Sequence, residues 1–246
     1  MDTGLVTDAQ KQQFVDIGYF ILEDLFDADE MDAVEAVIDS RVEEANDGLK
    51  VSGGQGISRP NEIVFTAFLA EKDDSLLEFV KGPKFVDITT RIIGPDVRLY
   101  WNQAVYKFPE THKEFPWHQD NGYTPVDPEQ YYTCWLALGD ATIDNGCVWL
   151  LPGSHKDGTR PHTDSDIGRV GYTGEDEGVP VAMKRGSMAV FSSLLLHRSG
   201  QNVTQGEVRK GYIVQFIPSH TRSATTGEAF TDRLWVAKEG VRYDGE

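Results

Sequence analysis

Two histidines and an aspartate, far apart in the chain, could together bind a metal ion. His118 and Asp120 stand at positions i and i+2, and in a β-strand such side chains project from the same face. His197 closes an apolar run later in the chain and could supply a third ligand. Two histidines and one carboxylate on one face of an iron ion leave three positions open, as in non-heme Fe(II) oxygenases. These residues therefore predict a catalytic iron site.

The His-x-Asp pattern is weak evidence by itself, because the chain contains three copies of it. The other two, at 155–157 and 162–164, lie in a segment rich in Gly, Pro, Thr and Asp that is typical of a loop. Apolar and aromatic residues precede only His118, which favours a walled cavity over a solvated turn. For His118 and Asp120 without further partners, a surface histidine beside an acid would be the commoner interpretation.

A candidate anion-binding residue, Arg209, opens a second apolar strand after His197. Arginine offers a planar bidentate donor that matches a carboxylate. Two alternatives stand beside this interpretation: Arg209 could form a structural salt bridge, or the neighbouring Lys210 could bind the anion instead. Alternation along a strand sends one of the two side chains inward and the other outward, so only one of them can face a site.

Further motifs accompany these residues in a characteristic order. They are Trp117-His118-Gln119-Asp120, Asn145-Gly146-Cys147, Leu151-Pro152-Gly153-Ser154-His155, His197-Arg198-Ser199-Gly200-Gln201-Asn202 and Arg209. Over about residues 94–218 the chain resembles the phytanoyl-CoA dioxygenase family of Fe(II)/2-oxoglutarate-dependent enzymes, with weaker similarity in the N-terminal helices. The resemblance implies that His118, Asp120 and His197 are the catalytic metal ligands, and that the cofactors are Fe(II), 2-oxoglutarate as cosubstrate, and O2.

The resemblance also implies a binding site for the distal carboxylate of 2-oxoglutarate. Arg209 would bind this carboxylate and Ser199 would be a second donor, while Trp135 and Gln103 would lie near the cosubstrate. Ser199 could equally cap a turn, and Trp135 is a candidate core aromatic whatever else it does. In the family, the spacing from the second histidine ligand to the arginine is usually slightly shorter than the spacing from His197 to Arg209. The assignment of Arg209 therefore requires a small insertion or bulge.

The composition indicates an acidic protein of one domain. The chain has 246 residues and a formal net charge of −17, which disfavours non-specific binding to nucleic acid or to an anionic membrane. The partner we expect is a small-molecule substrate, and the oligomeric state is unknown from the sequence. Cys134 and Cys147 lie in strand-like runs and are expected to be free buried thiols. Because no signal peptide or membrane-spanning run is recognisable, we expect a cytoplasmic protein.

Helical and strand-like patterns divide the single domain, residues 1–246, into three parts. Residues 1–95 are expected to be mainly helical, 96–218 to form a β-rich core and 219–246 to be a C-terminal extension. Helices are expected over 7–18, 27–46 and 75–93, the last interrupted at Gly82-Pro83, with a strand over 19–22 and a mobile loop over 50–60. Short strands are expected over 97–108, 115–120, 131–138, 148–151, 179–183, 187–191, 194–197 and 209–217.

Short strands separated by turn residues indicate a sandwich or a double-sheet jelly roll. The family resemblance implies the second, so the expected fold class is α+β, mainly β: a double-stranded β-helix (jelly roll, cupin-like) with the N-terminal helices packed outside. The long polar segment 152–178 follows a strand next to the candidate site and is expected to be a lid. Together with 50–60 and 121–129 it is expected to line the substrate pocket.

These expectations define two function hypotheses from different classes. The first is an Fe(II)/2-oxoglutarate-dependent oxygenase, an oxidoreductase that hydroxylates a small molecule and releases succinate and CO2. Desaturation or ring formation is compatible with the same ligands. The second is a non-catalytic metal- or ligand-binding jelly-roll protein that kept the fold. The complete set of ligands and arginine favours the enzyme, and no sequence signature identifies the substrate.

Overall fold

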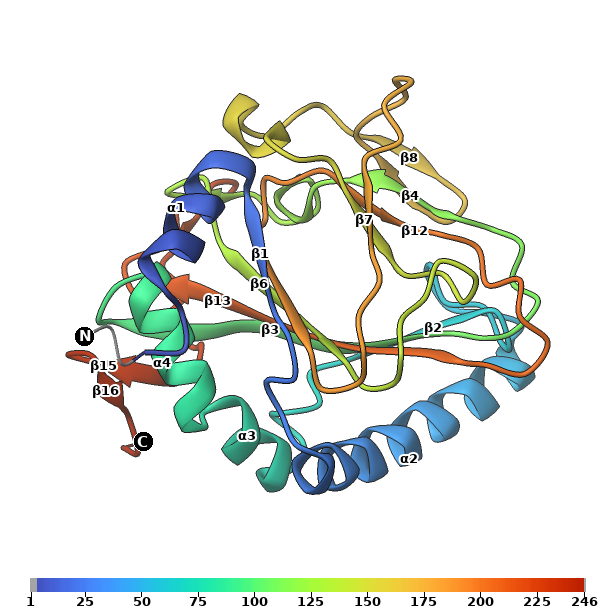
Figure 1. Ribbon diagram of the computed structural model, residues 1–246, viewed down its shortest axis with the longest axis horizontal. Helices are drawn as coiled ribbons and strands as arrows, with labels where there is room; N and C mark the ends of the chain where they lie inside the picture. The colour runs from blue at the N-terminus through green and yellow to red at the C-terminus, as the bar shows by residue number, and fades with distance from the viewer. Residues whose placement is uncertain (1–3, 246) are drawn as a thin grey trace.

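The computed structural model describes residues 4–245 of the chain. The expected absence of a signal peptide concerns the start of the chain, where residues 1–3 lie outside the described part. The α-helices of the described residues all precede the β-rich part, as expected (Figure 1). No helix within residues 4–245 has both the length and the apolar composition that a membrane span requires.

The α-helices form where the sequence has caps and apolar stripes. They are α1 (Asp8–Ile17), α2 (Ala28–Ser52), α3 (Asp74–Val80) and α4 (Pro83–Ile92). α1 begins with a capping box between Thr7 and Gln10 and ends at Gly18, whose φ of 90° is left-handed. The helix expected over 75–93 is interrupted as predicted, because Pro83 opens a new helix at its first position.

α2 is longer than expected and contains the first part of the predicted 50–60 loop. The sequence Asn46-Asp47-Gly48 favours an early end, yet the helix continues to Gly53, whose φ is 79°. Leu49 is buried about one turn beyond Asn46 and two turns beyond Val42, and it extends the stripe that packs on the core. Burial of Leu49 therefore outweighs the weak helix propensity of the preceding residues.

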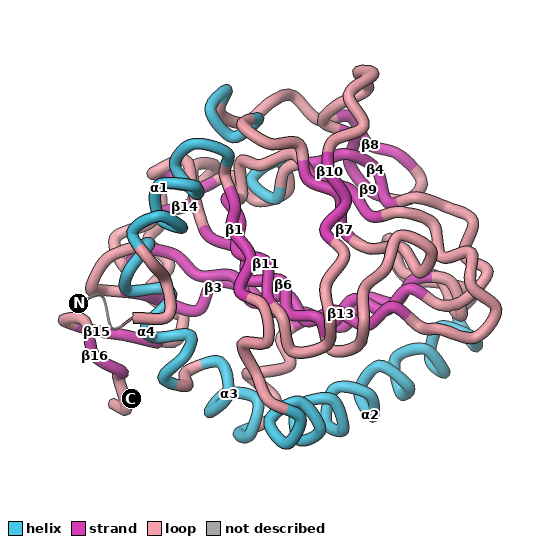
Figure 2. The backbone as a smooth tube through the Cα atoms, in the orientation of Figure 1, coloured by secondary structure: helices cyan, strands magenta, loops and turns pink. Residues whose placement is uncertain are grey.

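Two antiparallel sheets form the predicted double-stranded β-helix (Figure 2). The main path of the major sheet has the order β1 (Tyr19–Leu22), β11 (Met188–Ser192), β6 (Tyr132–Ala137), β13 (Arg209–Pro218), β3 (Val97–Lys107), β15 (Trp235–Lys238) and β16 (Val241–Arg242), and β2 (Ile63–Ala67) also pairs with β3. The minor sheet has the order β10 (Val179–Val181), β7 (Val148–Leu150), β12 (His197–Ser199) and β4 (Phe115–His118). Two small pairs are β14 (Arg222–Ser223) with β5 (Val126–Asp127), and β8 (Thr163–Ser165) with β9 (Gly168–Val170). The predicted fold class, α+β and mainly β, is confirmed.

The helices cover the outer face of the major sheet (Figure 1). The largest apolar cluster joins residues of α2 and α4 to Tyr212 and Phe216 of β13. Arg209, Ile213 and Gln215 alternate with these residues and face the space between the two sheets. Both faces of β13 are therefore buried: one holds the helices, and the other faces an internal cavity.

Two strand boundaries near the candidate site differ from the expectation. β4 ends at His118, and Asp120 begins a 3-10 turn, so the prediction that both residues share a strand face is wrong. β12 begins at His197 instead of ending there, because a tight turn in which Leu195 N–H bonds the Ser192 carbonyl precedes it. β2, β15 and β16 were not expected, and they extend the major sheet from the N-terminal and C-terminal parts.

Candidate active site

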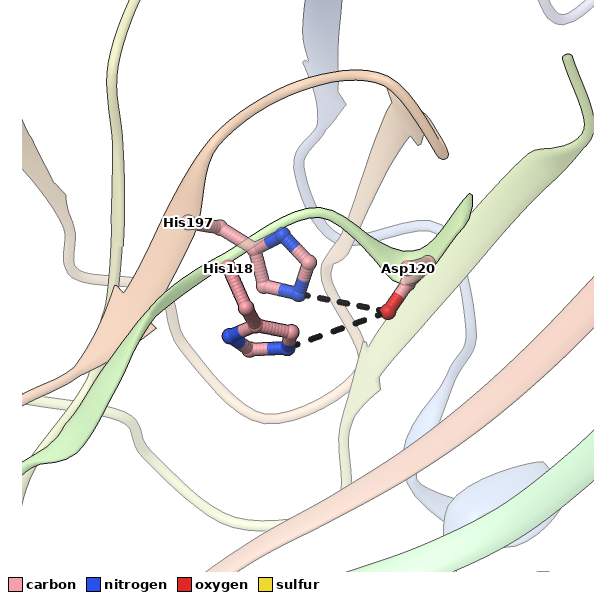
Figure 3. Close-up of side chains that lie close together, drawn as sticks. All are labelled: His118, Asp120 and His197. Atoms are coloured by element: carbon pink, nitrogen blue, oxygen red, sulfur yellow. Dashed lines mark ion pairs between the residues drawn. The ribbon is translucent and has the colours of Figure 1, made fainter. Parts of the chain in front are cut away.

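The ends of two paired strands bring the three candidate ligands together. β4 and β12 are antiparallel neighbours with His118 opposite His197, and the two ring centroids are 4.0 Å apart. Asp120 Oδ1 lies 3.9 Å from His118 Nε2 and 3.5 Å from His197 Nε2 (Figure 3). The three donor atoms all lie within 4.8 Å of one another, which allows them to share one metal ion.

Backbone carbonyls determine which nitrogen of each imidazole faces the centre of the site. His118 Nδ1 is 2.8 Å from the carbonyl oxygen of Pro116, and His197 Nδ1 is 3.0 Å from that of Leu195. Because a carbonyl oxygen only accepts, each Nδ1 donates its proton and each Nε2 directs its lone pair to the centre. Bonds of this kind orient metal-binding histidines.

Two side chains of the major sheet hold the carboxylate of Asp120. Thr133 Oγ1 on β6 and Gln215 Nε2 on β13 donate to Asp120 Oδ2 over 2.7 and 2.9 Å, which leaves Oδ1 directed at the imidazoles. The sequence analysis missed both donors. Strand alternation contains a signal for them, because Thr133 shares a face with Trp135 and Gln215 shares a face with Arg209.

The surroundings favour a neutral His118 and an ionised Asp120, as a divalent cation requires, whereas they favour the protonated form of His197. Burial lowers the pKa of His118 to about 3, so this imidazole is neutral at neutral pH. Burial opposes ionisation of Asp120, but the neighbouring histidines outweigh it and hold the pKa at about 2. For His197, burial opposes the charged form, and Asp120 outweighs burial and raises the pKa. One carboxylate with two imidazole nitrogens fits the donor set of non-heme Fe(II).

A cavity of about 360 Å³ extends from this cluster between the two sheets. Its walls are mainly apolar and aromatic. Each predicted cosubstrate residue lies on the wall: Gln103 on β3, Trp135 on β6, Ser199 on β12 and Arg209 on β13. The tertiary structure therefore brings the candidate metal ligands and the candidate cosubstrate residues into one cavity.

Arg209 is buried without an acidic partner among residues 4–245. It is 2 % exposed, its Nη1 donates to the Val105 carbonyl oxygen over 3.0 Å, and its Nε–H has no acceptor. The Trp135 ring centroid lies 5.5 Å from Arg209 Cζ, and only a glycine at 211 permits this approach, since a Cβ there would be 2.6 Å from the indole. Burial lowers the pKa of Arg209 to about 10, so it is charged at neutral pH. Arg209 forms no structural salt bridge within residues 4–245, and a carboxylate bound in the cavity would pair with its charge.

The neighbouring Lys210 points to the opposite face of β13. Its Nζ lies 2.7 Å from Glu35 Oε1 and 2.7 Å from Asp39 Oδ2, both on α2. The expected alternation of Arg209 and Lys210 is confirmed. Lys210 is therefore excluded as the cation that faces the cavity.

The loops expected to line the pocket do so only in part. Ile57 from the 50–60 loop and Tyr123 from the 121–129 segment line the cavity. None of the described residues that line it comes from 152–178. The expectation that this polar segment lines the pocket is wrong. His162 of the segment instead packs against Gln119 and Gly122, at the turn that follows β4.

The other two His-x-Asp copies do not contribute to the metal cluster. His155 Nε2 is 3.1 Å from the carbonyl oxygen of Val15 in α1. His162 Nε2 accepts a hydrogen bond of 2.9 Å from the backbone N–H of Gln119, the residue between two of the candidate ligands, and its Nδ1 donates to the Arg160 carbonyl. His162 therefore supports the turn that carries the candidate ligand Asp120, a role that the sequence analysis missed.

Comparison with known proteins agrees with this geometry. The family model for phytanoyl-CoA dioxygenase (PhyH) matches residues 14–211, which is most of the chain. The chain belongs to the phytanoyl-CoA dioxygenase family. The predicted family is confirmed, and the matched segment contains all three candidate ligands and Arg209.

Relatives in this family and in the wider fold support the architecture. Peroxisomal phytanoyl-CoA dioxygenase of Homo sapiens is 27% identical over 228 residues, which cover 84% of this chain and 67% of that protein. ThoJ, a non-heme monooxygenase in its apo form, has a TM-score of 0.74 at 22% identity, covering 95% of this chain and 86% of that chain. SnoK, an alpha ketoglutarate-dependent carbocyclase of nogalamycin biosynthesis, has a TM-score of 0.71 at 20% identity, covering 98% and 94%. At this identity the structural likeness establishes the fold.

Proposed function

We propose that this protein is an Fe(II)/2-oxoglutarate-dependent oxygenase in which His118, Asp120 and His197 hold the iron and Arg209 binds the distal carboxylate of 2-oxoglutarate. Membership of the phytanoyl-CoA dioxygenase family makes the protein an oxidoreductase of this class. When bound, iron and 2-oxoglutarate supply the oxidising power drawn from dioxygen, with release of succinate and CO2. The reaction we propose is hydroxylation of a small molecule.

One observation carries the proposal: a single cavity contains a cluster of metal donors and an arginine without a counter-ion. A dicarboxylate that chelates iron through its 2-oxo acid end needs a cation for its other carboxylate. Within residues 4–245 the Nε–H of Arg209 has no acceptor, and guanidinium matches the planar shape of a carboxylate. The cavity thus contains candidate binding groups for both ends of the cosubstrate.

The other residues of the site hold these groups in place and limit access of water. Thr133 and Gln215 engage one oxygen of Asp120, so that its second oxygen faces the metal position. We propose that Trp135 packs beside the cosubstrate and that Gln103 and Ser199 offer it polar contacts, since all three line the cavity. Aromatic walls exclude water, and electrostatic interactions are stronger in such a dry site.

The substrate group that enters the cavity is proposed to be uncharged and mainly apolar. Among charged lining residues, Asp120 belongs to the metal cluster, Arg209 faces the cosubstrate, and Arg198 pairs with Glu114 over 2.9 Å. No other Asp, Glu, Lys or Arg of residues 4–245 lines this cavity. The remaining wall includes Ile57, Ile63, Phe65, Trp101, Phe115, Tyr123 and Tyr131. Such a wall favours a hydrocarbon part of a small molecule at the reacting position.

The experiment that tests the proposal is anaerobic loading with Fe(II) and 2-oxoglutarate, followed by oxygen and measurement of succinate. Succinate is expected, and its rate is expected to rise with one member of a metabolite library. The member that raises it is then examined for hydroxylation by mass spectrometry. Iron binding without any succinate would instead favour the alternative, a non-catalytic metal- or ligand-binding protein of the same fold.

We also propose a single dioxygenase domain and a cytoplasmic location. In support of one domain, β1 and β2 from 1–95 and β15 and β16 from 219–246 join the sheet whose other strands lie in 96–218. In support of a reducing compartment, Cys134 and Cys147 are both free and buried. Limited proteolysis and cell fractionation test these two proposals.

A further inference from the structure

A lysine of β3 is buried behind the proposed cosubstrate pocket without an acidic partner. Lys107 is 1 % exposed, and its Nζ lies 3.0 Å from Ser199 Oγ, 3.3 Å from the Lys113 carbonyl oxygen and 2.5 Å from that of Gly200. No acidic side chain within residues 4–245 forms an ion pair with it. Placing an ammonium group among neutral partners is costly. Packing alone therefore does not explain why a lysine occupies position 107.

The surrounding chain holds Lys107 in place at both ends. Asn202 Nδ2 donates to the Lys107 carbonyl oxygen over 3.1 Å. Gly146, with a φ of 89°, packs against the stem: a Cβ there would lie 3.1 Å from Lys107 Cδ and 2.7 Å from the Gly200 carbonyl oxygen. The motif Asn145-Gly146-Cys147, which had no assigned role in the sequence, therefore makes room for this lysine.

Ser199 connects Lys107 to the cavity. Ser199 lines the cavity, whereas Lys107 lies behind it. In its ammonium form Lys107 only donates, so it then uses the Ser199 oxygen as an acceptor, and the Ser199 hydroxyl proton remains free to be donated. No acceptor within the described residues receives that proton. The serine is thus held as a donor for an acceptor in the cavity.

Lys107 also stands directly opposite Arg209 in the pairing of β3 with β13. Both are buried basic side chains without acidic partners among residues 4–245, and when both are charged they repel each other unless an anion lies nearby. We propose that Lys107 is a positioning residue for 2-oxoglutarate, which acts through the Ser199 hydroxyl and adds positive charge to the site of the distal carboxylate. This inference rests on the proposed function.

The charges on neighbouring elements support this role. Burial, together with Arg209 on β13 and Arg198 on β12, lowers the pKa of Lys107 to about 6, against the opposite effect of Glu114 before β4. A carboxylate bound beside Ser199 favours the charged lysine and raises this pKa. Binding of 2-oxoglutarate then takes up a proton above about pH 6. The affinity for 2-oxoglutarate is therefore expected to be highest below that pH and to fall as the pH rises.

The test compares two 2-oxo acids that differ only at the distal end. 2-Oxoglutarate, and 2-oxopentanoate with a methyl group in place of the distal carboxylate, are titrated calorimetrically and anaerobically into the iron-loaded protein. Lys107→Gln removes the charge and keeps a donor, and it is expected to weaken binding of 2-oxoglutarate at least about tenfold, or about 1.4 kcal/mol. Binding of 2-oxopentanoate is expected to be unchanged. Lys113→Met, which removes an exposed lysine nearby, is the matched control and is expected to bind both acids as the wild type does.

Four outcomes would count against the inference or against its premise. Unchanged affinity for 2-oxoglutarate in Lys107→Gln, or an equal loss for both acids, would overturn the role of Lys107. A wild-type protein that binds iron and neither acid would overturn the proposed function instead. If Lys107→Gln does not fold, Ser199→Ala keeps the lysine and removes its connection to the cavity. The fall in affinity with rising pH is then expected to disappear, and its persistence would overturn the inference.

Discussion

Each donor atom of the candidate metal site has a neighbour that determines its direction. Carbonyl oxygens hold both Nδ1 atoms, and two donors from the major sheet hold the outer oxygen of Asp120. These hydrogen bonds fix the directions of the donor atoms, which reduces the conformational cost of metal binding. At the scale of the residue, the predictions concern the ligands, their protons and Arg209.

Removal of any one ligand is expected to abolish tight iron binding. His118→Ala, Asp120→Ala and His197→Ala each leave two donors, and Asp120→Ala also removes the charged one. Iron content after anaerobic loading and desalting, measured by metal analysis, is expected to fall to background. His155→Ala is the control, because that histidine contacts α1 and not the cluster. Full iron content in all three ligand variants would place the site elsewhere.

Iron affinity is expected to decrease in acid. Burial opposes the charged form of His197, but Asp120 outweighs burial and raises the pKa, so a proton competes with the metal for Nε2. His197 is mainly protonated below its raised pKa. The affinity for iron therefore falls by about tenfold for each pH unit below that pKa. His118 does not limit binding there, since burial lowers its pKa to about 3. Competition titrations between about pH 5 and 8 measure the effect, and a flat profile would contradict it.

Arg209→Ala is expected to raise the Michaelis constant for 2-oxoglutarate at least about tenfold while iron binding persists. A hydrogen bond to a charged group contributes roughly 1.5 to 3 kcal/mol, and about 1.4 kcal/mol corresponds to tenfold. Arg209→Lys is expected to restore only part of the loss, because a point charge lacks the planar fork.

Lys210→Ala is the matched control for Arg209, since its side chain pairs with Glu35 and Asp39 on the opposite face. We expect it to lower the melting temperature and to leave the Michaelis constant unchanged. If Lys210→Ala raised the Michaelis constant for 2-oxoglutarate and Arg209→Ala left it at the wild-type value, the assignment of the two faces of β13 would be reversed.

At the scale of the element, the turn after β4 depends on a segment that is distant in the sequence. Asp120 begins a 3-10 turn, and His162 accepts the backbone N–H of Gln119 just before it. The ring of His162 also fills the space beside Gly122, where a Cβ would lie 2.3 Å from it. The polar segment 152–178 thus acts as a support for the ligand-bearing turn.

His162→Ala is therefore expected to weaken iron binding about 10- to 100-fold without removing a ligand, the usual cost of losing an outer partner of a metal site. His162→Gln retains an acceptor and is expected to recover part of the loss. Competition for iron with a chelator gives the affinities. His155→Ala again serves as control, and equal affinities in His162→Ala and His155→Ala would show that the hydrogen bond to Gln119 is dispensable.

At the scale of the whole molecule, the two sheets and the helices form a frame around one internal cavity. The formal net charge of −17 lies largely outside that cavity, whose wall contains Arg209, a buried cation without an acidic partner among residues 4–245. An anionic cosubstrate therefore meets a local field that opposes the global one. Because the candidate ligands come from β4, the following turn and β12, a metal ion bound to all three would link these elements to one another.

Fe(II) is accordingly expected to stabilise the folded protein. A metal at 100 times its dissociation constant adds about 2.7 kcal/mol, which for a domain of this size corresponds to a rise in melting temperature of about 5 to 10 °C. Anaerobic thermal melts with and without Fe(II) measure it. His197→Ala is expected to show no such rise, and a rise of equal size in that variant would indicate binding at another place.

Local patterns in the sequence determined several features of this protein by themselves. Helix caps at Thr7 and Gly18, the break at Pro83 and the alternation that separates Arg209 from Lys210 depend on neighbouring residues, and each is present in the structure. The family, the fold class and the candidate metal and cosubstrate residues on the cavity wall followed from motifs in a fixed order.

Only the tertiary structure decided which side chains complete the site. Thr133 and Gln215 meet Asp120 because β6 and β13 of one sheet face the turn after β4 of the other. Lys107 contacts Ser199, and His162 contacts Gln119. The members of each pair are far apart in the sequence, and no local pattern predicts such contacts. Local propensity acts over a few residues, whereas these contacts depend on how two sheets and a long polar segment pack together.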